Sequence, residues 1–392
     1  MNDSKQTDQL RRLGWAFVLG LIVAAQSIAR AEDSPKFSDV VTQHFEKWVH
    51  GSKGILTPER VKELVLRRDI RGAEAAALAS IHCYQRKAGT HAEEVTRSAL
   101  LSDKRKEDPT LRRDEVASGA NLSHNYKSFL KHLQTTPRHL FTKEHPSLEG
   151  IAQGHLGDCY FVSGVGAAVH RDPAVVRRLI ISRTDGSYEV RFRNGKHIHV
   201  PPLTDAELAL GSSAGHQGIW LNVLEMAAGT VEVEAQQKKS AELVVLDTLG
   251  EGGDSVFTIE LLTGHKAQKD LIRPHQKGAR PAPAERDVPQ LADKIAQHIR
   301  DALHHQRLVC CGVGRWTVPP GMGQWHQYAI LGINHGHVDL WNPWGSNYKF
   351  EPKGEPGLKH GYHTVGGKFS MPIHDFVRVF GAVNCETENL LK

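Results

Sequence analysis

The sequence predicts an α+β protein in which a small helical region precedes a core of two lobes, one helical and one β-rich. Apolar residues recur at helical spacing through much of the region before residue 145. Short apolar segments separated by turn residues alternate along the last quarter of the chain, which is typical of strands. The net charge of +5 is small for 392 residues, and the basic residues are scattered. This pattern argues against a nucleic-acid-binding surface.

The N-terminus predicts an exported protein. Arg11 and Arg12 precede the apolar run Leu13–Ala25, and Ala29 and Ala31 are the small residues expected before a cleavage site. Residues 1–31 are therefore predicted to be a signal peptide, and the mature protein to be periplasmic or secreted, from a bacterial source. A membrane span needs about 20 apolar residues, so no membrane association is expected beyond this segment. An uncleaved anchor is the alternative.

Residues 32–145 are predicted to be a helical N-terminal region. Thr57 and Pro58 form a helix start, with Thr as N-cap and Pro in the first turn. The stretch Gly51–Glu59 resembles an EF-hand loop without its acidic ligands, so it predicts a degenerate helix pair that cannot hold calcium. Further helices are expected at residues 73–86, 91–101 and 123–133.

The role of this region is open between an inhibitory pro-region and a structural or substrate-docking domain. The segment Ser102–Gly119 is dense in charge and predicts an exposed loop that proteases can cut.

The core divides at about residue 248. Residues 146–248 predict lobe 1, with a helix from Cys159, a hairpin closed by Asn194–Gly195 and a helix from Trp220. Residues 249–392 predict lobe 2, with a polar insertion near residues 265–287, a solvated loop at 273–289 and a helix at 288–304. Its strands are expected at residues 308–313, 328–333, 337–341 and 367–372.

Five cysteines are present: Cys83, Cys159, Cys310, Cys311 and Cys385. With Cys159 kept as a free thiol, the other four suffice for two disulfides in an oxidising compartment. Cys310 and Cys311 are not expected to pair with each other, because adjacent residues make a strained bridge. One or both can be core thiols of a buried strand.

Four residues have the chemistry that a thiol protease needs. Cys159 opens an apolar helix, where the helix dipole lowers a thiol pKa, and Gln153 is an amide donor six residues earlier. His326 follows 167 residues after Cys159, against about 130–150 in papain-type enzymes. The polar insertion accounts for the excess. Asn342 lies 16 residues after His326, enough for a strand, a turn and the next strand, so the two side chains are expected to meet across neighbouring antiparallel strands.

Each of these residues also has a plain structural alternative. Cys159 can be a small buried apolar residue, and His326 one of 24 mostly exposed histidines. Asn342 can be a turn former before a proline, and Gln153 a surface amide. Asp158 is expected to cap the helix that begins at Cys159 rather than to carry a proton.

The motifs resemble the catalytic core of the calpains, a branch of the papain-like cysteine peptidases. The resemblance covers about residues 148–380. It implies Cys159 as nucleophile, His326 as general base and acid, Asn342 as the group that orients His326, and Gln153 as oxyanion donor. The matching segments are Gln153–Gly154, Leu156–Cys159, Trp220–Glu225, Gly252–Gly253, Leu262–Gly264, His326 with Tyr328, and Asn342–Gly345.

The resemblance also implies supporting roles for two further residues. Trp344 would shield the hydrogen bond between His326 and Asn342 from water, and Gly157 would support the substrate-binding side of the site.

Calpain cores bind calcium through acidic loops, but this chain departs from that pattern. Gly150 stands where the family carries Asp, and Ser346–Lys349 replaces an acidic pair, although Glu225 is kept. Calcium prefers six to eight oxygen ligands including carboxylates. We therefore expect no metal site and no cofactor.

The function predicted from the sequence is a calpain-like cysteine endopeptidase that hydrolyses protein or peptide substrates through a thioester acyl-enzyme. Two alternatives stay open: an acyl transferase that uses the same thioester, and a non-catalytic binding module on the same fold. The oligomeric state and substrate specificity are left unassigned by the sequence.

Overall fold

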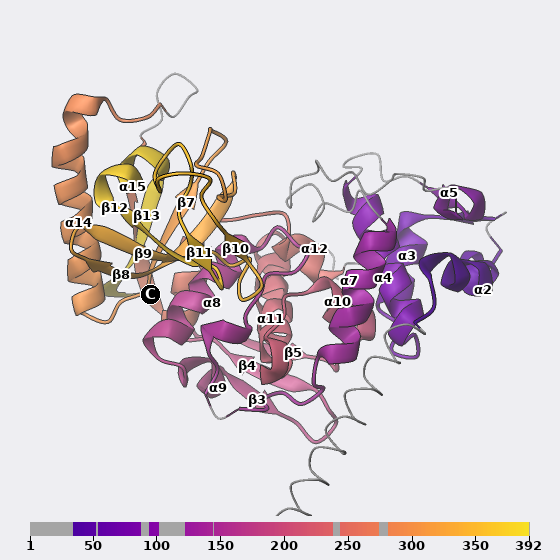
Figure 1. The fold of residues 1–392 in the computed structure, drawn as a ribbon. Helices are drawn as coiled ribbons and strands as arrows, with labels where there is room; N and C mark the ends of the chain where they lie inside the picture. Colours follow the sequence, from indigo (N-terminus) through magenta and orange to yellow (C-terminus); the bar gives the residue numbers. More distant parts are fainter. Residues whose placement is uncertain are drawn as a thin grey trace, which may run out of the picture.

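The computed structural model describes residues 34–51, 54–87, 94–101, 122–143, 145–237, 244–273 and 281–391. The predicted signal peptide and the predicted loop at 102–119 lie outside these residues. The protein has the predicted mixture of helices and sheets, with helices from the N-terminal region at one end and an eight-stranded sheet at the other (Figure 1).

The N-terminal region is a pair of linked helical units. One comprises α2 (Phe37–Val49) and α3 (Pro58–Val65), the other α4 (Gly72–Lys87) and α5 (Arg97–Leu101). The short strands β1 (Ile55–Leu56) and β2 (Val95–Thr96) join them by antiparallel pairing. This arrangement corrects the helix predicted at 91–101, because Val95–Thr96 is a strand and the helix begins at Arg97.

Helix α3 begins as predicted. The side chain of Thr57 accepts a hydrogen bond from the backbone N–H of Arg60 at 3.2 Å, and Pro58 occupies the first turn. Helix α7 (Leu122–Thr135) follows and packs against α4, close to the predicted limits 123–133.

The middle of the chain combines helices with a small antiparallel sheet. Its strands are β3 (Ile180–Ser182), β4 (Tyr188–Arg191) and β5 (His197–Val200), and Gly195 has φ +85° in the β4–β5 turn. The hairpin was predicted, but β3 was not. The helices of this part are α8 (Cys159–Arg171), α9 (Val175–Leu179), α10 (Asp205–Leu210), α11 (Trp220–Ala235), α12 (Val245–Leu249) and α13 (Ser255–Thr263), with the 3-10 turns η1 (Leu148–Gly150) and η2 (Gly215–Gln217).

The last part of the chain is dominated by an antiparallel sheet in the order β10-β11-β12-β9-β8-β7-β13-β6. Helix α14 (Val288–His304), with the limits predicted, and α15 (Ile373–Val379) pack against each other, after the short 3-10 turn η4 (Glu285–Asp287). The strands are β6 (His265–Leu271), β7 (Val309–Val313), β8 (His326–Asn334), β9 (His337–Trp341), β10 (Lys349–Phe350), β11 (Thr364–Val365), β12 (Lys368–Pro372) and β13 (Ala382–Leu390).

Two strands of this sheet correct the sequence analysis. The stretch predicted to be a polar insertion begins with the edge strand β6, which pairs with β13 from the C-terminal end of the chain. Neither strand was predicted. Within the predicted solvated loop, residues 274–280 lie outside the described part.

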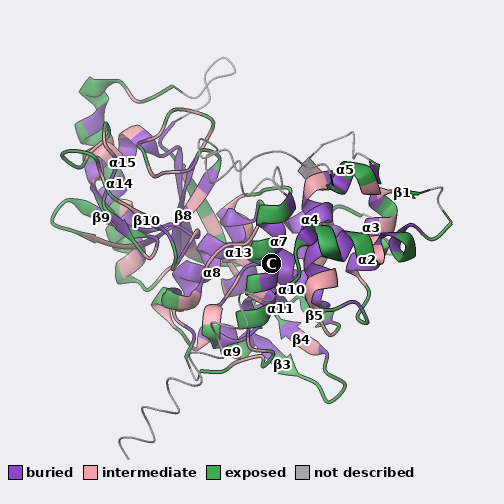
Figure 2. Ribbon diagram, turned by 45° about the vertical axis from the view of Figure 1, so that its right-hand side comes forward, coloured by how far each residue is buried: buried purple, intermediate pink, exposed green. Residues whose placement is uncertain are grey.

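Helix α8 is central to the molecule. Its residues Cys159–Val169 are all buried, and it packs against β8 on one side and α13 on another, so it is apolar around most of its circumference (Figure 2). One apolar core runs from α2 through α8 and α11 to α13, and a second fills the space between the large sheet, α14 and α15. No helix in the described ranges has the length and apolarity needed to cross a bilayer.

All five cysteines are free and buried, so the two disulfides considered from the sequence are not formed. Cys310 and Cys311 are fully buried core thiols of β7, as one of the sequence interpretations had it. The boundaries at residues 145 and 248 stay predictions.

Candidate active site

Cys159 is the first residue of α8 and lines a cavity together with His326, the first residue of β8. Its side chain is almost completely buried, and Sγ lies 3.9 Å from the carbonyl oxygen of Trp325. Burial raises the pKa of the Cys159 thiol to about 12, and the backbone N–H of Gln327 acts in the opposite direction. In this arrangement the thiol is protonated at neutral pH, so forming a thiolate requires a nearby proton acceptor.

His326 and Asn342 meet as predicted. His326 is the first residue of β8, and Asn342 directly follows β9, which pairs with β8 in antiparallel register. His326 Nε2 and Asn342 Oδ1 form a buried hydrogen bond of 2.8 Å. Because the amide oxygen can only accept, it fixes the tautomer with the proton on Nε2 and leaves Nδ1 as the basic nitrogen.

Trp344 covers this hydrogen bond. Its ring centroid lies 4.8 Å from that of His326, and its backbone N–H donates to Asn342 Oδ1 at 3.0 Å. Tyr328 meets the other side of the imidazole edge-on, with centroids 4.9 Å apart. The His326 ring is therefore held by one hydrogen bond and two aromatic contacts.

Gln153 is close to the nucleophile, but its amide is engaged elsewhere. Its Nε2 donates to the Leu156 carbonyl at 2.8 Å and to Asp158 Oδ1 at 3.1 Å, which accounts for both amide hydrogens. An oxyanion would have to draw one hydrogen away from these acceptors. Gln153, the predicted oxyanion donor, is therefore close to Cys159, but both of its amide hydrogens are already donated to protein acceptors.

Asp158 has a different role from the predicted helix cap. It occupies the N-cap position of α8, yet its side chain makes no capping hydrogen bond. Burial and the neighbouring Asp158 raise the pKa of Glu225 well above its usual value. Burial likewise raises the pKa of Asp158, and its buried Oδ2 has no hydrogen-bond partner within the described ranges.

Two backbone hydrogen bonds fasten the segment of Gln153 to the turn after Asn342. The N–H of Gln153 donates to the Pro343 carbonyl at 2.7 Å, and that of Ser346 to the Ile151 carbonyl at 3.0 Å. Gly345 has φ +79°, and a Cβ added there would lie 1.9 Å from the Ile151 carbonyl oxygen. Only glycine allows this close approach of the two backbone segments, which explains why residue 345 of the Asn342–Gly345 motif is a glycine.

Gly157 is likewise placed by a close backbone approach. A Cβ at this position would lie 2.6 Å from the Gly250 carbonyl oxygen. Gly157 itself lines the cleft beside Cys159.

The cleft is a cavity of about 660 Å³ that contains most of the predicted site. It is lined by Cys159, His326, Gln153, Gly157 and Trp344, whereas Asn342 lies behind His326 and is almost fully buried. Sequence reasoning missed two other parts of the lining, namely Trp325 and one face of helix α7. Trp325 was recognisable only as an aromatic flank of His326, and nothing local in the sequence of α7 indicated a cleft.

The residues in place of the family's calcium ligands do not fit a calcium site. A Cβ at Gly150 would lie 2.0 Å from Gln217 Nε2, so no carboxylate fits there without rearrangement. Both oxygens of Glu225 accept from the backbone N–H of Ser212, at 3.0 and 2.9 Å. The described residues include no group of three or more His, Cys, Asp or Glu that could hold a metal ion.

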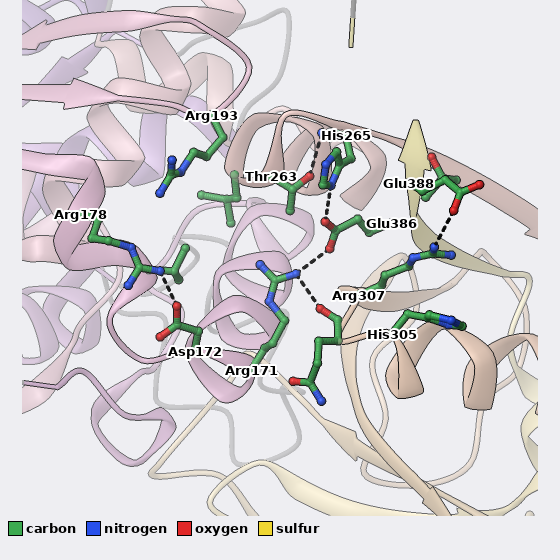
Figure 3. A pocket seen from close by; sticks show the side chains of 14 residues that line it. Arg171, Asp172, Arg178, Arg193, Thr263, His265, His305, Arg307, Glu386 and Glu388 are labelled. Carbon is green, nitrogen blue, oxygen red and sulfur yellow. Dashed lines mark hydrogen bonds and ion pairs between the residues drawn. The ribbon is translucent and has the colours of Figure 1, made fainter. Parts of the chain in front are cut away.

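A second hollow, of about 430 Å³, lies at the other end of α8 and contains none of the predicted site residues (Figure 3). Arg171, at the C-terminal end of α8, donates to Glu386 of β13 at 2.6 Å. Glu386 is buried and also binds His265 Nδ1 at 2.7 Å and the N–H of Leu308 at 2.8 Å. This ion pair ties the helix that carries Cys159 to the large sheet.

The comparison with protein families agrees with this geometry. The model for calpain family cysteine proteases matches residues 128–385, which is well over half of the chain and includes Cys159, His326 and Asn342. The match begins within α7 and ends in β13, so it includes both sides of the cleft. The chain belongs to the calpain family of cysteine proteases.

Proposed function

We propose that this protein is a cysteine endopeptidase with Cys159 and His326 as catalytic residues and Asn342 as the residue that positions His326. The observation that carries the proposal is the buried 2.8 Å hydrogen bond between His326 and Asn342, in a cavity that His326 shares with Cys159. A protease domain of this family implies protein substrates.

The reaction begins with proton transfer from the Cys159 thiol to His326 Nδ1. The thiolate attacks the peptide carbonyl carbon, a C–S bond forms, and the charge moves to the carbonyl oxygen. His326 then gives its proton to the amine as the C–N bond breaks, which leaves a thioester. Water, deprotonated by His326, hydrolyses the thioester and restores the thiol.

The oxyanion would be held by the backbone N–H of Cys159 and by Gln153. Because both Gln153 hydrogens already bind acceptors, this assignment requires the amide to turn when the carbonyl of the substrate becomes charged. Asp158, whose Oδ1 accepts from Gln153 Nε2, would hold the amide next to the nucleophile.

We further propose a two-lobe, papain-like arrangement whose activity does not depend on calcium. The first lobe would carry Cys159, and the second His326 and Asn342. The side chain of Gln217 supports calcium independence, because it occupies the space beside Gly150 and links to Ser147 through two hydrogen bonds. We also propose export after cleavage at Ala31, supported by the sequence of residues 1–31.

The test is hydrolysis of unfolded casein by the mature chain from Glu32, with EGTA and with millimolar calcium, beside a Cys159→Ala variant. We expect cleavage in EGTA that disappears in the variant. Cleavage only with calcium would contradict the proposed calcium independence.

Absence of cleavage under both conditions would remove support for the peptidase proposal. The same samples with an added amine acceptor would then separate an acyl transferase, which forms an amide product, from a module that only binds.

A further inference from the structure

Helix α7 forms one wall of the catalytic cleft, although it belongs to the region predicted to precede the core. Residues spaced along one face of the helix line the same cavity as Gln153 and Trp344. Their spacing of three or four positions is that of a single helical stripe. The stripe consists of His124, Ser128, Lys131 and Thr135, and Phe129 and His132 of the same helix also line the cavity.

The other face of α7 is anchored, so this wall has a fixed position. Tyr126, Leu130 and Leu133 are buried against the helical part of the molecule. The Tyr126 hydroxyl donates to the Pro35 carbonyl at 2.6 Å, and the Phe129 ring meets His155 of the cleft edge-on, with centroids 4.5 Å apart. A fixed wall can contribute to substrate selection, because its side chains need not be ordered on binding.

The charged side chains that line the cleft are basic rather than acidic. Among the described residues that line it there is no Asp or Glu. Lys131 is exposed to the cavity and has no ion-pair partner within the described ranges. The nearby Arg138 is already paired with Asp205 at 3.2 Å. Burial lowers the pKa of His132 to about 4, so this neighbour is neutral at pH 7 and Lys131 supplies the fixed positive charge.

We propose that the cleft selects polypeptides that carry an acidic side chain, Asp or Glu, placed to meet Lys131 of α7. The inference rests on the proposed peptidase function and adds a substrate class to it. A carboxylate in the partly enclosed cavity pairs with Lys131 in a lower effective dielectric than bulk water offers, and it meets no acidic side chain of the lining. A neutral or basic side chain gains nothing at this position.

The first measurement is a cleavage profile of a peptide library by mass spectrometry, which reads residue preference on both sides of the scissile bond. We expect Asp and Glu to be enriched at one position in the wild type. For a matched pair of peptides that differ only by Glu or Gln at that position, kcat/KM should favour Glu by about 5-fold, the upper range for a partly exposed ion pair.

Charge reversal identifies the partner. Lys131→Glu should invert the preference between the two peptides, mainly through KM, and higher salt should weaken the wild-type preference. The matched control is Lys127→Glu on the same helix, because Lys127 is exposed and does not line the cleft. No acidic preference in the wild type, or equal loss of preference in both variants, would overturn the inference.

A binding assay separates this inference from the proposed function. Fluorescence anisotropy with the Cys159→Ala variant measures the affinity for the labelled Glu and Gln peptides without catalysis. If this variant prefers the Glu peptide, the added Lys131→Glu substitution reverses that preference, and the wild-type chain cleaves neither peptide, the acidic subsite is supported while the peptidase proposal fails. If the wild type cleaves both peptides equally well and the variant binds them equally well, the peptidase proposal is supported and the acidic subsite is ruled out.

Discussion

Trp325 combines backbone strain with an exposed aromatic ring at the edge of the cleft. It has φ +49°, its side chain is 70% exposed, and its carbonyl oxygen lies 3.9 Å from Cys159 Sγ. A bulky residue in the left-handed region is an outlier that commonly marks a functional site. The strain is retained at the residue that precedes His326, and it places the Trp325 carbonyl next to the Cys159 thiol.

Replacing Trp325 by Gly should relieve the backbone strain and remove the aromatic ring, and the two effects are measured separately. We expect the free energy of unfolding to rise by about 1 kcal/mol, because glycine adopts positive φ without the Cβ penalty. We also expect KM for peptides to rise, because the ring that lines the cleft is lost. Chemical denaturation and steady-state kinetics measure the two effects.

The control for this substitution is Trp325→Ala, which removes the ring but keeps the strained backbone. It should raise KM similarly without the gain in stability. If both variants are equally stable, the positive φ at this residue carries no measurable strain.

At the scale of elements, the turn η2 is joined to η1 by a side-chain amide. Gln217 is buried, its Oε1 accepts from the N–H of Ser147 at 2.6 Å, and its Nε2 donates to the Ser147 carbonyl at 3.0 Å. A bidentate amide satisfies both backbone groups of Ser147. These two hydrogen bonds fix the chain that leads to Gln153.

Gln217→Ala should therefore destabilise the protein by about 1–3 kcal/mol, because two partly buried backbone groups of Ser147 lose their partner. Thermal unfolding measured with and without millimolar calcium is the appropriate test. We expect a lower melting temperature in the variant and no effect of calcium on either protein. A calcium-dependent rise in the wild type would show that this interpretation of η1 and η2 is wrong.

The elements that the sequence predicted well have strong local signals. Helix α14 has the predicted limits because its apolar residues follow a regular helical period and Pro lies in its first turn. The antiparallel pair β8 and β9 was recognisable from two apolar runs around a short turn. In these segments local propensity and tertiary packing favour the same structure.

The missed strands lack such signals. Strand β6, His-Lys-Ala-Gln-Lys-Asp-Leu, is polar because it lies at the edge of the sheet, and it becomes a strand only by pairing with β13 from more than a hundred residues later. Val95 and Thr96 form a strand by pairing with Ile55 and Leu56. In these segments, backbone hydrogen bonds to residues distant in the sequence determine the secondary structure.

For the whole molecule, the contact between α8 and the large sheet determines whether the cleft is formed. Cys159 is at one end of α8, and Arg171, about 18 Å along the helix, is at the other end. The hydrogen bonds of Arg171 and His265 to the buried Glu386 hold that far end against β13 (Figure 3). This ion pair should help to keep Cys159 aligned with His326.

Glu386→Ala should lower the free energy of unfolding by about 2–4 kcal/mol, since it removes the charged partner of Arg171 and the acceptor of the Leu308 N–H. The control is Glu388→Ala on the same strand, because Glu388 is highly exposed and contacts Arg307 only at 3.4 Å. That substitution should be nearly neutral. Urea denaturation of both variants gives the comparison, and equal losses would mean that the buried ion pair has no special contribution.

The sequence by itself determined the order and chemistry of Cys159, His326 and Asn342, because glycines, prolines and aromatic residues at fixed spacing encode local turns and helix starts. Only the tertiary structure decided that Gln153 is hydrogen-bonded to Asp158 and that Asp158 faces Glu225 instead of capping α8. It also decided that α7 is a wall of the cleft. The physical reason is that each of these contacts joins side chains brought together by burial and packing, which no local pattern of residues records.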